Sequence, residues 1–251
     1  MGTWISHLRI AEQLLVELPD LDETAFTFGN LAPDSGIPNE TWTEFDPPKE
    51  ITHFSTRNGD ESTIHDMEFY RAYLAGTHAN DDKARYSFML GYFFHLLTDH
   101  LWAARVWRPS KQYFKEIVEA KGKLNAAWDF KADWYDQDHR YLRDNPDCLF
   151  WRVFLHAPLP LAYLHYLPLA AIHQQIHSIR KFYAEPGTRS LDRTYPFLND
   201  ATMSRFVNDT ATLLLKIYRL LPASDQLVCD NSALALLSAH EKLPYPAPLG
   251  D

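Results

Sequence analysis

The segment Gly-Tyr-Phe-Phe-His-Leu-Leu-Thr-Asp-His, which ends at His100, places ionisable side chains inside an apolar run. His95 and Asp99 are four residues apart, so on a helix they lie on the same face. An aspartate is unfavourable in a core unless a cation meets it, and no lysine or arginine is a close neighbour of this pair. A metal ion bound by both side chains would supply the charge. The alternative is a pair satisfied by hydrogen bonds within the core.

Gly91 lies one further turn back on the face that carries His95 and Asp99. Glycine inside a helix costs about 1 kcal/mol relative to alanine. We therefore expect another backbone or a ligand cluster to approach this helix closely. His100 is five residues after His95, which turns it about 140° away on a helix, so we expect it to have a supporting role.

Three further residues carry a metal-ligating group but are weak candidates when each is taken alone. His7 lies in the apolar stripe of a helix, where a histidine is usually part of the core. Asp34 follows Pro33 and reads alone as a turn or cap aspartate. His53 follows a long irregular stretch over residues 33–51, and such a loop in a compact domain is often functional.

A second group of acidic and histidine side chains has a more ordinary interpretation. Asp129, Asp133 and Asp136 follow helical spacing, which is typical of a surface ion-pair stripe. If that face turns toward the histidines, Asp133 would add a ligand or orient one. His173 and His177 also share a helix face, but they flank an apolar stripe beside polar residues, so we expect them to be solvated.

Composition excludes several other chemistries. The 251 residues include two cysteines, twelve histidines and nine glycines. There is no Cys-x-x-Cys pair, so a metal site must use histidine and carboxylates. There is also no phosphate-binding glycine-rich loop, no Gly-x-Ser-x-Gly and no His-Glu-x-x-His. The formal net charge is −9 and no basic run stands out, which argues against a duplex nucleic-acid partner.

The beginning of the chain and its apolar segments favour a cytoplasmic protein. The first residues lack the charged and apolar regions of a signal peptide. No window of 18 residues is apolar and uncharged, so we expect no transmembrane segment.

Helical periodicity dominates the chain, whereas no convincing alternating strand and no internal repeat is found. We therefore predict an all-α fold, a bundle of roughly seven to nine helices in a single domain over residues 1–251. Helices are predicted over residues 4–18, 62–77, 82–107, 110–121, 125–143, 169–183, 200–221 and 231–241, with a short helix or turn over 24–32 and a loop over 186–198.

Taken in order, four segments resemble the zinc-dependent phospholipase C family, which is related to the fungal single-strand nucleases. The segments are Trp4…His7-Leu-Arg-Ile-Ala, Phe-Gly-Asn-Leu-Ala-Pro-Asp34, Thr-His53-Phe and Gly-Tyr-Phe-Phe-His-Leu-Leu-Thr-Asp99. The resemblance covers roughly the first 110 residues. It implies an all-α fold with a metal cluster in a central cleft.

Carried over residue by residue, the resemblance implies that Asp34, His53, His95 and Asp99 hold one zinc ion. Asp99 would bridge to a second zinc ion that also binds His7. Manganese or iron would tolerate the same ligands.

The chain departs from the family at two points. In the secreted relatives a mature N-terminal tryptophan supplies backbone groups to the second ion, whereas Trp4 here is preceded by three residues. The relatives also have a histidine shortly after the bridging aspartate, and here the residue six positions on is Arg105. We therefore expect one or two metal ions rather than three.

The resemblance implies a metal-dependent hydrolase that acts on a small-molecule or lipid phosphoester, such as a phospholipid. Asp34 would orient or deprotonate the attacking water as well as bind metal. Trp42, Trp102 and Trp107 are candidates for an apolar wall beside the site, although large aromatic residues are more often core.

Two alternatives remain open at this point. An HD-type helical phosphohydrolase would use the dipeptide His65-Asp66, and it predicts that both side chains face the metal. A non-catalytic helical protein would keep a structural metal, or none, and serve in interactions. Metal content and turnover of a phosphodiester distinguish these alternatives.

Overall fold

Helices form most of the chain, which confirms the predicted all-α class. The structure is a computed structural model that describes residues 2–41, 44–58, 61–185, 187–221 and 231–245. Its α-helices are α1 (Trp4–Glu17), α2 (Glu23–Gly29), α3 (Lys49–Thr52), α4 (Asp66–Tyr73), α5 (Lys83–Trp102), α6 (Arg108–Lys121), α7 (Lys123–Asp144), α8 (Leu169–Ala184) and α9 (Asp200–Leu220).

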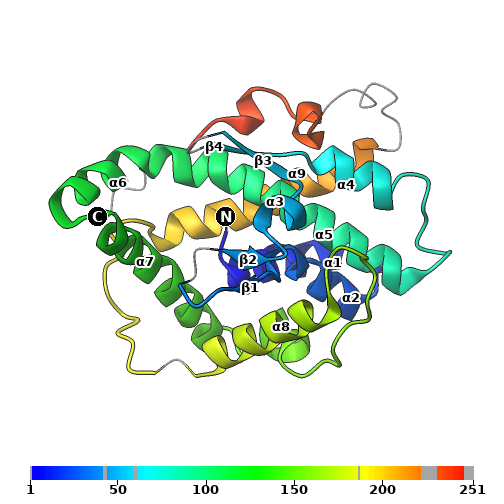
Figure 1. Ribbon diagram of the computed structural model, residues 1–251, viewed down its shortest axis with the longest axis horizontal. Helices are drawn as coiled ribbons and strands as arrows, with labels where there is room; N and C mark the ends of the chain where they lie inside the picture. Colours follow the sequence, from blue (N-terminus) through cyan, green and yellow to red (C-terminus); the bar gives the residue numbers. More distant parts are fainter. Residues whose placement is uncertain (1, 42–43, 59–60, 186, 222–230, 246–251) are drawn as a thin grey trace.

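The longest element is a rod made of α5 and α6. A π-helical segment, Ala103–Trp107, joins the two helices (Figure 1). The rod begins where the side chain of Asp82 accepts a hydrogen bond from the backbone of Arg85. Nearly every residue of α5 from Ser87 onward is buried, which explains why its sequence is apolar on all sides.

Helix α2 lies directly against α5, and two glycines allow this approach. A Cβ atom on Gly29 would lie 2.1 Å from the backbone oxygen of Phe88, and one on Gly91 would lie 2.5 Å from that of Phe26. Side chains at these positions would clash with backbone atoms that cannot move independently. The close approach expected at Gly91 is therefore present, and its partner is the backbone of α2.

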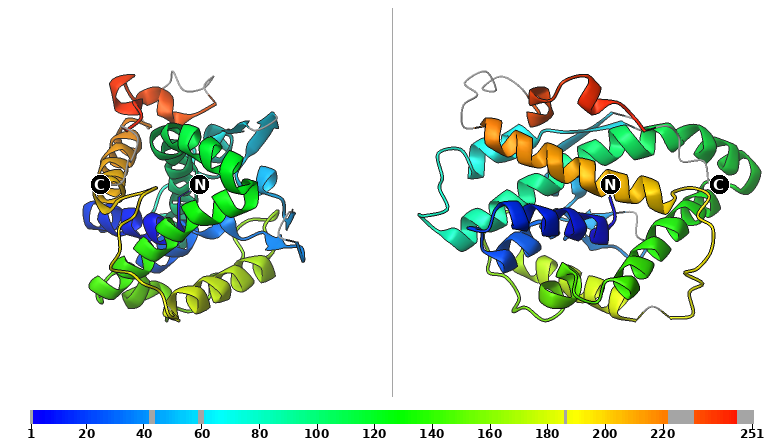
Figure 2. Two further views of the ribbon diagram at one scale, coloured as in Figure 1. Left: turned by 90° about the vertical axis from the view of Figure 1, so that its left-hand side faces the viewer. Right: turned by 180° about the vertical axis from the view of Figure 1, so that it is seen from behind.

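The other helices surround this pair. Helix α9 lies along α1 on the back of the molecule (Figure 2). Helix α8 lies on the opposite side of α1 and α2 from the α5–α6 rod, and α7 runs from the end of α6 toward α8 (Figure 1). Helix α1 starts at Thr3, whose side chain caps it by accepting from the Ser6 backbone.

Two short antiparallel hairpins differ from the prediction. Strands β1 (Ile37–Pro38) and β2 (Phe45–Asp46) pair within the predicted irregular stretch, and β3 (Ser55–Asn58) pairs with β4 (Glu61–Ile64). The helix predicted over 62–77 is correspondingly shortened to α4. The second hairpin is largely exposed on both faces, so its sequence lacks the alternation that a half-buried strand shows.

The last predicted helix is also different. Instead of one helix over 231–241, the described residues there form two 3-10 turns, Ala233–Leu236 and His240–Lys242. Within the described residues, no helix combines the length and apolar character needed to cross a membrane.

Candidate metal centre

The five residues that the sequence singled out as metal ligands meet in the core. His7 comes from α1, Asp34 from a 3-10 turn after α2, His53 from the end of α3, and His95 and Asp99 from α5. Their side chains are at most 6 % exposed. Two groups have donor atoms close enough to hold a metal ion: His7 with His95 and Asp99, and Asp34 with His53 and His95.

The donor atoms of four residues are spaced like the corners of a metal site. His53 Nε2 lies 3.4 Å from both Asp34 Oδ1 and His95 Nε2. Asp99 Oδ2 lies 3.6 Å from the Nε2 atoms of His53 and His95. Bonds of roughly 2.1 Å to a tetrahedral zinc ion put neighbouring ligands about 3.4 Å apart. The spacing of His53 from Asp34, His95 and Asp99, and of His95 from Asp99, therefore matches the spacing of zinc ligands.

Asp99 presents its two oxygens to different histidines. Oδ2 faces His53 and His95, whereas Oδ1 lies 3.4 Å from His7 Nε2. The His7 and His95 rings are stacked, with centroids 4.0 Å apart. Asp99 therefore directs one oxygen toward His53 and His95 and the other toward His7.

Hydrogen bonds from outside the cluster orient its ligands. The carbonyl oxygen of Asn30 lies 2.8 Å from His95 Nδ1. A carbonyl only accepts, so Nδ1 carries the proton and the Nε2 lone pair of a neutral ring is free to bind a cation. Thr52 Oγ1 lies 3.0 Å from His53 Nδ1, where a hydroxyl can donate or accept. Trp4 donates its indole N–H to Asp34 Oδ2 at 3.0 Å.

Several polar atoms in the cluster lack a hydrogen-bond partner within the described part of the chain. They are both ring nitrogens of His7, Oδ1 of Asp34 and Oδ2 of Asp99. Buried polar atoms of this kind are normally satisfied by protein, water or an ion. Their convergence at one place, together with the donor spacing, is what a metal site requires.

The pKa shifts in the cluster keep its acidic groups ionised. Burial raises the pKa of Asp34, but the close contact with His53 and nearby positive charges reverse this and hold it below its usual range. Burial also raises the pKa of Asp99. The interactions with His95 and His7 act in the opposite direction, and the pKa lies well below its usual value. Burial and the neighbouring His95 lower the pKa of His7 to about 4, so near neutral pH this ring is an uncharged ligand.

The segment before α1 is held against the cluster by α7. The Gly2 backbone N–H donates to Asp99 Oδ1 at 2.9 Å, and Thr3 donates its hydroxyl to Asp138 at 2.8 Å. Asp138 also accepts from the Tyr183 hydroxyl at 2.5 Å. Asp138 thus positions the chain segment that reaches Asp99.

Asp138 gives a testable pH dependence. Burial raises its pKa to about 7, although the hydrogen bonds from Tyr183 and Thr3 oppose the rise. The folded protein therefore holds a proton that the unfolded chain releases above about pH 4. This contribution to stability is complete at lower pH and is lost as the pH rises through about 7.

We expect the non-titrating variant Asp138→Asn to gain stability relative to the wild type, by up to roughly 4 kcal/mol, between about pH 4 and pH 8. The measurement is urea unfolding of both proteins across this range in the presence of a chelator. A difference in the free energy of unfolding that does not change with pH would contradict the assignment.

The other candidates lie outside the two groups. Asp133 accepts from Arg193 and from the Phe197 backbone, both at 2.7 Å, so it fixes the loop before α9. Asp136 pairs with Arg189 and Arg193. The face that carries Asp133 therefore forms ion pairs, but Asp133 and Asp136 are buried beneath the loop before α9 and do not lie on the surface, where the spacing had placed them.

The dipeptide His65-Asp66 also lies outside both groups. His65 contacts the Thr56 hydroxyl, and Asp66 pairs with His100 at 3.3 Å and accepts from the Ala233 backbone. This arrangement differs from what the HD-type alternative predicts. His100 has the supporting role expected of it, because together with Asp66 it holds the segment after residue 231.

Three remaining residues are placed as follows. His177 is exposed, as expected, whereas half-buried His173 contacts the carbonyl of Pro160.

Arg105 is buried and donates to Asp209 and Tyr245. Arg105 thus anchors the end of the described chain.

A cavity of about 400 Å³ adjoins the cluster at Asp34. Trp102 and Trp107 line it, as the sequence suggested, and Trp42 lies outside the described residues. Its remaining lining residues are Gly2, Thr3, Trp4, Pro38, Phe45, Lys49, Lys131, Trp134, Tyr135 and Gln175. The volume is within the usual range for a small-molecule site.

Some residues of this site give little signal in the sequence. Asp138 lies among other charged residues of α7, and its link to Asp99 through the segment before α1 depends on tertiary contacts. Lys49 and Lys131 reach the cavity from elements that are distant in sequence. Trp4 is an exception, because a tryptophan at this place is part of the resemblance to the phospholipase C family.

The chain matches no family model, no curated protein and no solved structure. The metal centre is therefore inferred from the side chains and distances described above.

Proposed function

We propose that the protein is a metal-dependent hydrolase, with zinc as the metal and a phosphodiester as the substrate. The observation that carries the proposal is the position of Asp34. This residue belongs to the buried cluster of three histidines and two carboxylates, and it also lines the adjoining cavity. A substrate in the cavity would therefore meet the cluster at a carboxylate.

The ligands support zinc as the metal. Imidazole and carboxylate groups in tetrahedral spacing suit zinc, although manganese and iron accept the same ligands. Asp34, His53, His95 and Asp99 would hold one ion, and His7 with the second oxygen of Asp99 would hold another. When bound, zinc would act as a Lewis acid: it would activate water near neutral pH and offset negative charge on phosphoryl oxygens.

Asp34 is suited to act on the water that attacks the substrate. Its lowered pKa keeps it ionised, which makes it a weak proton acceptor but suits it to orient a water by accepting a hydrogen bond. The Trp4 indole fixes Oδ2, while Oδ1 has no hydrogen-bond partner among the described residues. The resemblance to the phospholipase C family suggests the same double role for this aspartate.

The proposal predicts turnover of a simple phosphodiester by the zinc-loaded protein. With bis(4-nitrophenyl) phosphate, we expect hydrolysis that a chelator abolishes and added zinc restores. Asp34→Asn should lower kcat at least about a hundredfold, because it removes both a metal ligand and the carboxylate that orients the attacking water. Release of nitrophenolate, followed by absorbance, measures the rate.

Asp133→Asn is the matched control. It also neutralises a largely buried aspartate, but one that contacts Arg193 rather than the cluster. Its rate should stay close to that of the wild type. Zinc binding without turnover in the wild type would favour a non-catalytic metal-binding module, and absence of zinc after zinc-supplemented expression would refute the proposal.

A further inference from the structure

Two lysines line the cavity of an otherwise acidic protein. Lys49 lies in α3 and Lys131 in α7, and both are half-buried. Asp34 is the acidic residue among the described residues that line the same cavity. The lining is therefore locally positive, although the whole chain has a formal net charge of −9.

The two ammonium groups influence one another. Burial lowers the pKa of Lys131, and the positive charge of Lys49 lowers it further. Lys131 Nζ lies 5.2 Å from the centre of the Trp128 ring. Lys49 Nζ lies 5.1 Å from the centre of the Phe45 ring. An anion in the cavity that both lysines line would offset their positive charges.

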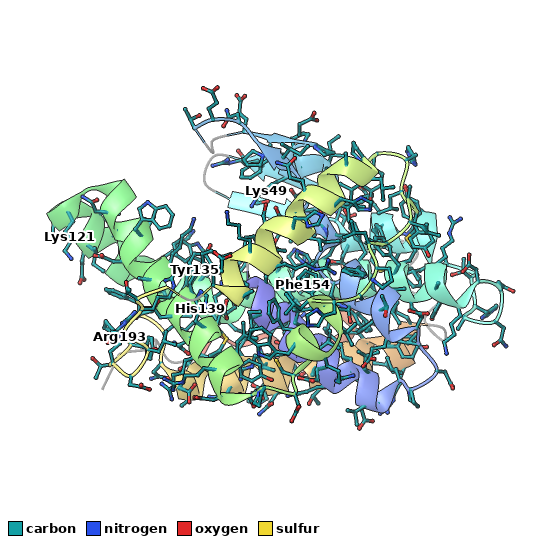
Figure 3. The ribbon with its side chains drawn as sticks, turned by 90° about the horizontal axis from the view of Figure 1, so that it is seen from below. Lys49, Lys121, Tyr135, His139, Phe154 and Arg193 are labelled. Carbon is teal, nitrogen blue, oxygen red and sulfur yellow. The ribbon has the colours of Figure 1, made fainter. Side chains whose placement is uncertain are left out.

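Aromatic side chains form much of the remaining wall. Trp4, Trp107, Trp134 and Tyr135 all line the cavity. In Figure 3, Lys49 and Tyr135 both lie beside α8 near its left-hand end, and they come from α3 and α7. A flat apolar group would pack well against these rings, and an anionic group beside it would reach the lysines.

Building on the proposed hydrolase function, we propose that the substrate carries a second anionic group beside its phosphodiester. Lys49 and Lys131 bind this second anion, and the aromatic residues pack against an adjoining ring or apolar group. A choline-like cationic head group would meet two like charges at this place and is disfavoured. A nucleotide with an additional phosphate and an acidic phospholipid share the chemistry that the cavity recognises.

Binding of matched anions tests the inference separately from turnover. We would titrate the zinc-loaded protein calorimetrically with thymidine 3′,5′-bisphosphate and with thymidine 5′-phosphate. The wild type should bind the bisphosphate at least about tenfold more tightly, as expected for one or more charge-assisted hydrogen bonds. This preference should fall in Lys131→Met and approach unity in the double variant with Lys49→Met.

Lys121→Met is the matched control, because Lys121 at the end of α6 pairs with Asp129 of α7 and does not line the cavity (Figure 3). It should keep the full preference. Unchanged zinc content and thermal unfolding would show that the lysine variants are folded. A second comparison, of dihexanoyl phosphatidylserine with dihexanoyl phosphatidylcholine as competitors, shows whether the anion belongs to a lipid.

The outcomes separate the two proposals. A lysine-dependent preference for the more anionic member of either pair supports the second anion, even if no phosphodiester is hydrolysed, in which case only the hydrolase function fails. Equal affinities within both pairs would overturn the inference. A preference that survives in the double variant would overturn it as well, since the lysines would then not be its cause.

Discussion

Replacing Asp99 with asparagine should remove bound metal more completely than a change at any neighbouring buried aspartate. Asp99 directs Oδ2 toward His53 and His95 and Oδ1 toward His7. His95 belongs to both groups but has one free ring nitrogen, whereas Asp99 directs a separate oxygen toward the histidines on each side. Asparagine lacks the charge that holds a cation there. We expect metal affinity to fall well beyond the tenfold to hundredfold loss that is typical when only a supporting residue is changed.

The measurement is the metal content of protein expressed with added zinc and then dialysed, determined by elemental analysis. The wild type should retain one or two zinc ions, and Asp99→Asn should retain little or none. Asp66→Asn is the matched control, because Asp66 is also fully buried and also pairs with a histidine, but lies outside both candidate groups. His177→Ala controls for an exposed histidine. Equal losses in all variants would refute the assignment.

Replacing Gly29 with alanine should cause the largest loss of stability among single-methyl additions to this chain. The new Cβ would lie 2.1 Å from the Phe88 carbonyl oxygen, a backbone atom in α5. Relief requires α2 to move away from α5, and both helices lead into the cluster, since the Asn30 carbonyl orients His95. Overpacking a core costs typically about 1–3 kcal/mol, and a clash with backbone should exceed that range.

Urea unfolding of the metal-free protein measures this loss, and zinc content measures its effect on the cluster. Gly76→Ala is the control, because Gly76 has a positive φ of 71° and open space around its Cβ position. It should cost only about 1–2 kcal/mol, the strain of a left-handed residue. A Gly29→Ala loss no greater than the Gly76→Ala loss would contradict the close packing of α2 on α5.

The centre of the candidate site was predictable from local sequence. An aspartate in an apolar helix places a negative charge in the core, and this charge needs a cation to balance it. The four-residue spacing alone puts this aspartate and the histidine on one face of the helix. His7, Asp34 and His53 carry no such signal individually. Their assembly depends on long-range contacts, and only the resemblance, read in chain order, brought them into one set.

The parts that were not predicted share a physical cause. Strands β3 and β4 are exposed on both faces, so they show no hydrophobic alternation. Gly91 predicted that another part of the molecule approaches α5 closely. It did not predict that this part is α2, because a glycine indicates a close contact without identifying the contacting segment. Lys49 and Lys131 read in sequence as ordinary surface residues, and only the fold places them at one cavity.

An anomalous difference map at the zinc absorption edge, from crystals of the zinc-loaded protein, tests the metal centre most directly. We predict a peak enclosed by the Nε2 atoms of His53 and His95 with oxygens of Asp34 and Asp99, and a second peak beside His7 if two ions bind. Peaks confined to other places, such as the Asp133–Arg193 loop or the surface, would contradict the account.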